Sequence, residues 1–229
     1  MFGHASAQSS LFLDESSLPS YMLDQKDPLF YSEGVIATAS GTSSLCGPTS
    51  VMNWLQLRHQ NAYSKIQLVK FVQLIGNDLR AQRVEINNGL TEPQLLKFLE
   101  IYNSYLEENS EYVYVNRGEL QPLDILNNKP QILMLRYSEV VRYMPGRNRD
   151  DFKIPFSGAH YVLKVGAIDD QILVIDPENP TYLTRLKLEE TKEGSMKVFR
   201  VRPQSKRDLQ SFAYGVPLIW SMTGLIQEK

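Results

Sequence analysis

GAHYVLKVGAIDDQILVIDP, residues 158–177, is the segment that decides the predicted fold, because it has the pattern of two strands joined by a tight turn. Apolar and β-branched runs flank Asp169 and Asp170, which predicts an antiparallel hairpin with its turn at these two residues. His160 stands near the start of the first strand, and Asp176 comes directly after the second. Adjacent strands lie about 4.8 Å apart, so we expect the hairpin to bring these two side chains level.

Outward from the hairpin, the next informative segment is CGPTSVMNWLQLRH, which begins at Cys46. Residues 47–59 are predicted to form a helix, because Pro48 suits a first turn and apolar residues follow at helical spacing. A thiol at a helix N-terminus feels the positive end of the helix dipole, which favours the thiolate. Gly47 lets a substrate backbone approach, and the Cys46 N–H can help to hold an oxyanion. A buried, inert cysteine at this position fits the pattern equally well.

The general base that a thiol nucleophile needs can be sought among three histidines. His59 lies at the far end of the predicted helix, roughly 20 Å from Cys46 at 1.5 Å per residue. His4 lies in a polar leader, so His160 remains as the expected base. Asp176 is then expected to accept from the imidazole and to orient it. The alternatives are a core histidine with satisfied hydrogen bonds and an aspartate that only caps a turn.

The rest of the chain predicts helices first and strands afterwards, an α+β layout. Three more helices are expected: one with an apolar stripe over residues 68–79, one over 91–106 and a brief one around 120–126. Strands are expected at the following residues: 112–115, 130–137, 182–188 and 196–202. Residues 138–157 form a long polar segment that we predict to be a loop bordering the site. Residues 1–34 are expected to be an N-terminal arm, and 35–229 the single domain.

The composition excludes several functional classes. The net charge is −2 without a basic stripe, which argues against nucleic acid as a partner. No apolar run reaches about 18 residues, so no membrane span is expected. One cysteine excludes an intrachain disulfide, and the absence of nucleotide-binding and zinc motifs predicts no cofactor and no metal.

Three blocks in this order, CGPTSVMNWL, PQILMLRY and GAHYVLKVGAIDDQILVIDP, resemble papain-like cysteine peptidases, specifically the bacteriocin-processing (double-glycine) type. The resemblance implies a helical half packed on an antiparallel sheet, with the active-site cleft between them. It also implies a catalytic triad of Cys46 as nucleophile, His160 as base and Asp176 as orienting group. The family carries a glutamine oxyanion donor shortly before the cysteine. Here the nearest candidate is Gln25, which requires an insertion before Cys46.

The implied activity is hydrolysis of peptide amide bonds, with a peptide or protein as substrate. Two alternatives stay open: a thiol acyltransferase or cross-linking enzyme, and an inactive peptidase-like module that binds peptides. The oligomeric state is left open. A bacterial, secreted or periplasmic protein is slightly favoured by the resemblance and by Ala5-Ser6-Ala7, which is similar to a signal-cleavage site but lacks a charged or apolar region before it.

Overall fold

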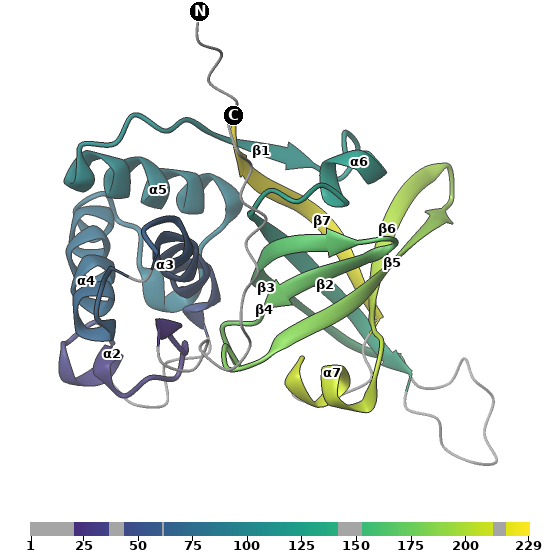
Figure 1. The fold of residues 1–229 in the computed structure, drawn as a ribbon, viewed down its shortest axis with the longest axis horizontal. Coiled ribbons are helices and arrows are strands. Elements are labelled where there is room, and N and C mark those ends of the chain that lie inside the picture. The colour runs from purple at the N-terminus through teal and green to yellow at the C-terminus, as the bar shows by residue number, and fades with distance from the viewer. Residues whose placement is uncertain (1–20, 37–43, 61, 142–152, 213–218) are drawn as a thin grey trace, which may run out of the picture.

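The protein combines a group of helices with an antiparallel β-barrel, and the helices lie on one side of the barrel (Figure 1). The computed structural model describes residues 21–36, 44–60, 62–141, 153–212 and 219–229. Residues 1–20 of the expected arm lie outside this part, whereas Met22, Leu23 and Phe30 are buried in the core. The boundary at residue 34 therefore stays a prediction.

The helical part is built around α3 (Cys46–Arg58), whose residues from Cys46 to Leu57 are all buried. A helix buried on every face belongs at the centre of its layer. Ser64 caps α4 (Lys65–Ala81), because its side chain accepts from the Gln67 N–H while the Gln67 side chain accepts from the Ser64 N–H. The other helical elements are α2 (Leu29–Ser32), η2 (Ile86–Asn88), α5 (Glu92–Leu106), α6 (Pro122–Ile125) and α7 (Lys206–Ser211).

The strands form one antiparallel sheet in the order β1-β7-β2-β3-β4-β5-β6, and β6 also pairs with β7. This additional pairing closes six strands, β2 to β7, into a barrel, while β1 extends the sheet beyond β7. The strand bounds are β1 Tyr112–Asn116, β2 Gln131–Val141, β3 Lys153–Ile168, β4 Gln171–Ile175, β5 Leu183–Glu193, β6 Met196–Pro203 and β7 Ile219–Glu228.

The predicted fold class, a papain-like helical half packed on an antiparallel sheet with a cleft between them, is wrong. The sheet is a closed six-stranded barrel with helices on one side. The physical reason is β7, a strand that the sequence analysis did not predict, which pairs with β1, β2 and β6. Without that strand the expected sheet had two open edges, and nothing joined its ends.

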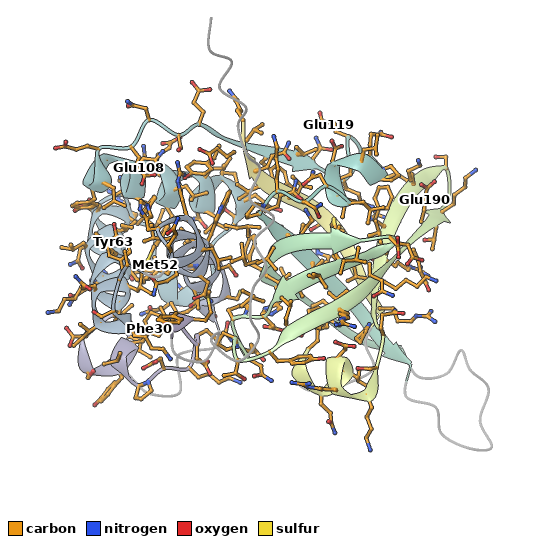
Figure 2. All side chains as sticks on the ribbon, viewed as in Figure 1. Phe30, Met52, Tyr63, Glu108, Glu119 and Glu190 are labelled. Atoms are coloured by element: carbon orange, nitrogen blue, oxygen red, sulfur yellow. The ribbon has the colours of Figure 1, made fainter. Side chains whose placement is uncertain are left out.

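Alternation along β3 divides the apolar residues into two clusters. Tyr161, Leu163 and Val165 belong to the cluster shared with the helices, which also contains Met52 and Phe30 (Figure 2). Val162 points the opposite way and belongs to the cluster that fills the barrel. β3 is therefore buried on both faces, one against the helices and one inside the barrel.

The barrel also buries one lysine, Lys164, on the same face of β3 as Val162. Its Nζ donates to the carbonyl oxygens of Asn127 at 2.6 Å and Lys129 at 2.9 Å. It also donates to the side-chain oxygens of Asn127 at 3.1 Å and Gln131 at 2.9 Å. Burial lowers the pKa of Lys164 from 10.5 to about 7, although all four neighbouring oxygens are acceptors.

Several local predictions are confirmed. Helices at 47–59, 68–79 and 91–106 correspond to α3, α4 and α5, and the hairpin turns at Asp169 and Asp170. Both ends of the predicted loop over residues 138–157 are strand instead, because β2 continues to Val141 and β3 begins at Lys153. Residues 142–152, for which we predicted a role at the border of the site, lie outside the described residues.

Candidate active site

Cys46 begins α3, one residue before the helix start that the sequence predicts. Its side chain is buried at the edge of the helical layer, with 7% of the residue exposed. Ser50, one turn further along, donates its hydroxyl to the carbonyl oxygen of Tyr161 at 3.2 Å, which fixes the start of α3 against β3. A Cβ added at Gly47 would lie 3.2 Å from Leu95 Cδ1 and 3.3 Å from Tyr161 Cδ2, so glycine permits this close packing.

The hairpin brings His160 and Asp176 together, as the sequence predicts. His160 Nε2 lies 2.8 Å from Asp176 Oδ1, and the Asp176 side chain is fully buried. The same carboxylate oxygen accepts from the backbone N–H of Glu178 at 2.9 Å, so the turn after β4 holds it in place. Because Nε2 faces the carboxylate, Nδ1 is the imidazole nitrogen left for a second partner.

That second partner is Cys46, which forms a side-chain hydrogen bond with His160. Burial is the largest single influence and acts to lower the pKa of His160, whereas the charge and hydrogen bond of Asp176 act to raise it. The hydrogen bond and charge of Cys46 act in the same direction, and together they raise the pKa of His160 well above its usual 6.5. The arrangement therefore favours an imidazolium beside the Asp176 carboxylate.

The segment that leads to Gln25 runs along α3. Upstream of it, Asn53 Nδ2 donates to the carbonyl oxygen of Leu23 at 3.0 Å, and Asn53 Oδ1 accepts from the Leu23 N–H at 2.7 Å. Gln56 Nε2 donates to the carbonyl oxygen of Tyr21 at 3.1 Å. From Tyr21 to Leu23, the contact on α3 thus moves from Gln56 to Asn53, which is about one turn nearer the start of the helix. The segment therefore runs in the direction of the first turn, where Cys46 lies.

The Gln25 side chain is completely buried and contacts the turn that follows β4. Its backbone N–H donates to the carbonyl oxygen of Pro177 at 2.8 Å, and its Nε2 donates to Glu178 Oε1 at 2.7 Å. The candidate oxyanion donor therefore lies beside the residues next to Asp176. Although many residues separate Gln25 from Cys46 in the sequence, Gln25 lies against the turn that follows Asp176.

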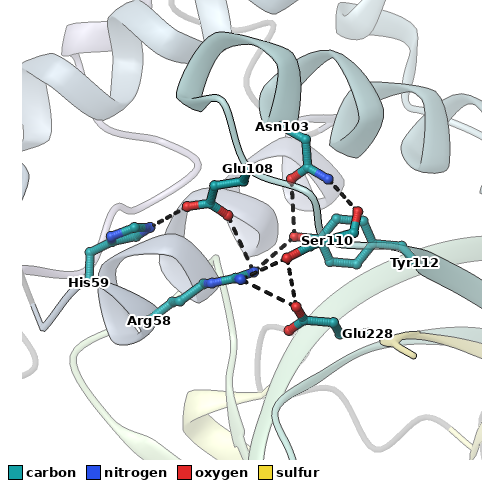
Figure 3. Close-up of polar contacts among 7 residues, drawn as sticks. All are labelled: Arg58, His59, Asn103, Glu108, Ser110, Tyr112 and Glu228. Carbon is teal, nitrogen blue, oxygen red and sulfur yellow. Dashed lines mark hydrogen bonds and ion pairs between the residues drawn. The ribbon is translucent and has the colours of Figure 1, made fainter.

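His59 lies where the sequence places it, at the C-terminal end of α3 and remote from Cys46. Its Nε2 lies 2.9 Å from Glu108 Oε1 (Figure 3). Arg58 is the centre of the same network and donates to Ser110 Oγ at 2.7 Å and to Glu228 Oε1 at 3.2 Å. These contacts join α3 to the α5–β1 connection and to β7, so this cluster is structural.

Sequence reasoning missed three residues that surround the imidazole. The rings of Trp220 and Phe212 lie 6.0 Å and 6.5 Å from the His160 ring, between centroids. Glu178, the third, follows Asp176 by two residues, and nothing in the pattern distinguishes it from a solvent-exposed acid. The only signal for Trp220 was its rarity, because the chain has two tryptophans.

The described residues contain no group of three or more His, Cys, Asp or Glu side chains suited to a metal ion. Within the same part of the chain, no helix has the length and apolar character needed to cross a membrane. No protein-family model matches the chain, and no curated protein matches its sequence.

Proposed function

We propose that this protein is a cysteine peptidase that cleaves peptide amide bonds through a thioester acyl-enzyme. The observation that carries the proposal is the position of His160, hydrogen-bonded to Cys46 and 2.8 Å from the buried Asp176 carboxylate. An activated nucleophile, a base and a group that orients the base are the three parts that such chemistry needs. The sequence blocks that resemble bacteriocin-processing peptidases support the same reaction class, and the proposal does not depend on the overall architecture that the barrel replaces.

The reaction follows from these three side chains. The Cys46 sulfur attacks the carbonyl carbon and forms a C–S bond, and His160 gives its proton to the leaving amine as the C–N bond breaks. Water then attacks the thioester, His160 takes a proton from it, and the C–S bond breaks to release the acid and the thiolate. Asp176 keeps Nε2 occupied throughout, so that Nδ1 exchanges the proton with the sulfur and the substrate.

The test combines a peptide library with alkylation of the thiol by iodoacetamide. Wild-type protein is expected to cleave members of the library and to be alkylated rapidly at Cys46. Cys46→Ala should abolish both, and His160→Ala should abolish cleavage and slow alkylation strongly. His59→Ala is the matched control, because this histidine lies in the structural cluster at the other end of α3. It should retain both activities.

Mass spectrometry of the products, with and without an added amine, separates hydrolysis from acyl transfer. Free acid as the main product in the presence of the amine supports the peptidase. An amide of the added amine as the main product would replace it by the acyltransferase. If wild type neither cleaves the library nor reacts faster than a free thiol, the peptidase proposal is wrong and a peptide-binding module takes its place.

A further inference from the structure

The buried amide of Gln25 has one partner and an unpaired oxygen. Its Nε2 donates to Glu178 Oε1 at 2.7 Å, whereas its Oε1 is buried and has no hydrogen-bond partner among the described residues. A buried amide usually satisfies both ends, so this arrangement needs a reason. A carboxylate only accepts hydrogen bonds, which means that ionised Glu178 fixes which end of the amide faces it.

A primary amide carries two N–H donors, and Glu178 occupies one of them. The described residues supply no acceptor for the second, and the amide lies against the turn that also holds the Asp176 carboxylate. Glu178 is itself well placed for this task. Its backbone N–H donates to Asp176 Oδ1 at 2.9 Å, so the turn that holds the orienting carboxylate also places the Glu178 side chain. With 8% of that side chain exposed, little freedom remains for it to move.

We propose that Glu178 is a positioning residue, which holds the Gln25 amide so that its second N–H donates to the oxyanion formed when Cys46 attacks a carbonyl. This inference rests on the proposed peptidase function and extends it by one residue. Glu178 does not touch the substrate and acts only through Gln25. A donor fixed before the reaction stabilises the developing charge without reorganising, which is the source of oxyanion-hole catalysis.

Charged groups around Glu178 affect how it holds the amide. Burial raises the pKa of Glu178 to about 7; His160 and Lys26 act to lower it, and Asp176 and Asp24 act to raise it. Lys26 Nζ lies 3.7 Å from Glu178 Oε2, on the exposed side. A protonated carboxyl keeps a carbonyl oxygen that can still accept from Gln25. The conservative variant Glu178→Gln therefore retains the acceptor.

The experiment compares four variants: Gln25→Ala, Glu178→Leu, Glu178→Gln and the double variant Gln25→Ala/Glu178→Leu. Three quantities are measured for each. They are hydrolysis of the best library peptide, affinity for the corresponding peptide aldehyde, and the rate of alkylation by iodoacetamide. The aldehyde forms a thiohemiacetal with Cys46 and so develops an oxyanion, whereas alkylation displaces iodide and develops none.

Gln25→Ala is expected to lower kcat by about 10²-fold with little change in KM, as for loss of one oxyanion donor. Glu178→Leu should lower kcat by about 10-fold or more and weaken aldehyde binding, while its alkylation rate matches that of Glu178→Gln, which also lacks the charge beside His160. Glu178→Gln should recover most of the activity. The double variant should be no slower than Gln25→Ala alone, because Glu178 acts through that amide. If Glu178→Leu does not fold, Glu178→Ala removes the same acceptor without added bulk.

Two results would overturn the inference while leaving the peptidase intact. One is a Glu178→Leu variant as active as the wild type, and the other is a double variant whose loss is the product of the two single losses. Failure of the proposed function has a different signature. In that case the wild type itself shows no turnover and no selective alkylation of Cys46, and both proposals fall together.

Discussion

Replacing Lys164 by methionine tests how the barrel tolerates a buried ammonium group. Burial lowers the pKa of Lys164 from 10.5 to about 7, so between these values the unfolded chain carries a proton that the folded chain has lost. The free energy of unfolding then rises by about 1.4 kcal/mol for each pH unit over this window. From about pH 6 to about pH 9, wild type should gain about 3 kcal/mol relative to Lys164→Met, which has no such group.

Urea unfolding at several pH values, followed by tryptophan fluorescence, gives the free energy of each variant. Lys187→Met is the matched control, because Lys187 is a half-exposed lysine in a surface ion pair with Asp170. Its pH dependence should parallel that of the wild type. If Lys164→Met also parallels the wild type, the four oxygen acceptors keep the ammonium charged, and burial does not control this lysine.

Two further predictions concern the triad and the structural cluster. Asp176→Asn should lower the pKa of His160, because the carboxylate charge is a main cause of its elevation; an unchanged imidazole titration by NMR would contradict this. In the wild type, that elevation stabilises the fold below pH 6.5, and the contribution is lost as pH rises through the raised value. Arg58→Met should cost about 1 kcal/mol of unfolding free energy in urea, since several partners depend on one guanidinium, whereas the exposed Lys97→Met should cost under about 0.5. Equal losses in these two variants would show that the cluster adds nothing.

The local parts of this structure follow from the sequence. Helical spacing identified α3, α4 and α5, and the apolar runs around Asp169 and Asp170 identified the β3–β4 hairpin. That hairpin places His160 beside Asp176, because the turn position and the distance between adjacent strands bring these two residues level. The pairing of Cys46 with His160 could be predicted because neither of the other two histidines was suited to be the base.

The long-range parts did not follow. Residues 212–226 contain Gly215, Pro217 and Gly224, which interrupt the apolar run and weaken the strand pattern of this segment. As a result β7 was not predicted, and barrel closure depends on its pairing with β2 and β6. The contact between Gln25 and Glu178 joins residues 153 positions apart, which no local pattern encodes.

The close seating of α3 on β3 makes the spacing between sulfur and imidazole depend on residues that take no part in the chemistry. A Cβ at Gly47 would lie only 3.2 Å from Leu95 Cδ1 and 3.3 Å from Tyr161 Cδ2, and Ser50 ties the same helical turn to the strand. A methyl group at this seam would press on both side chains, which must shift by a few tenths of an ångström to admit it. A substitution at this junction would therefore act on the distance between the sulfur and the imidazole without altering either group.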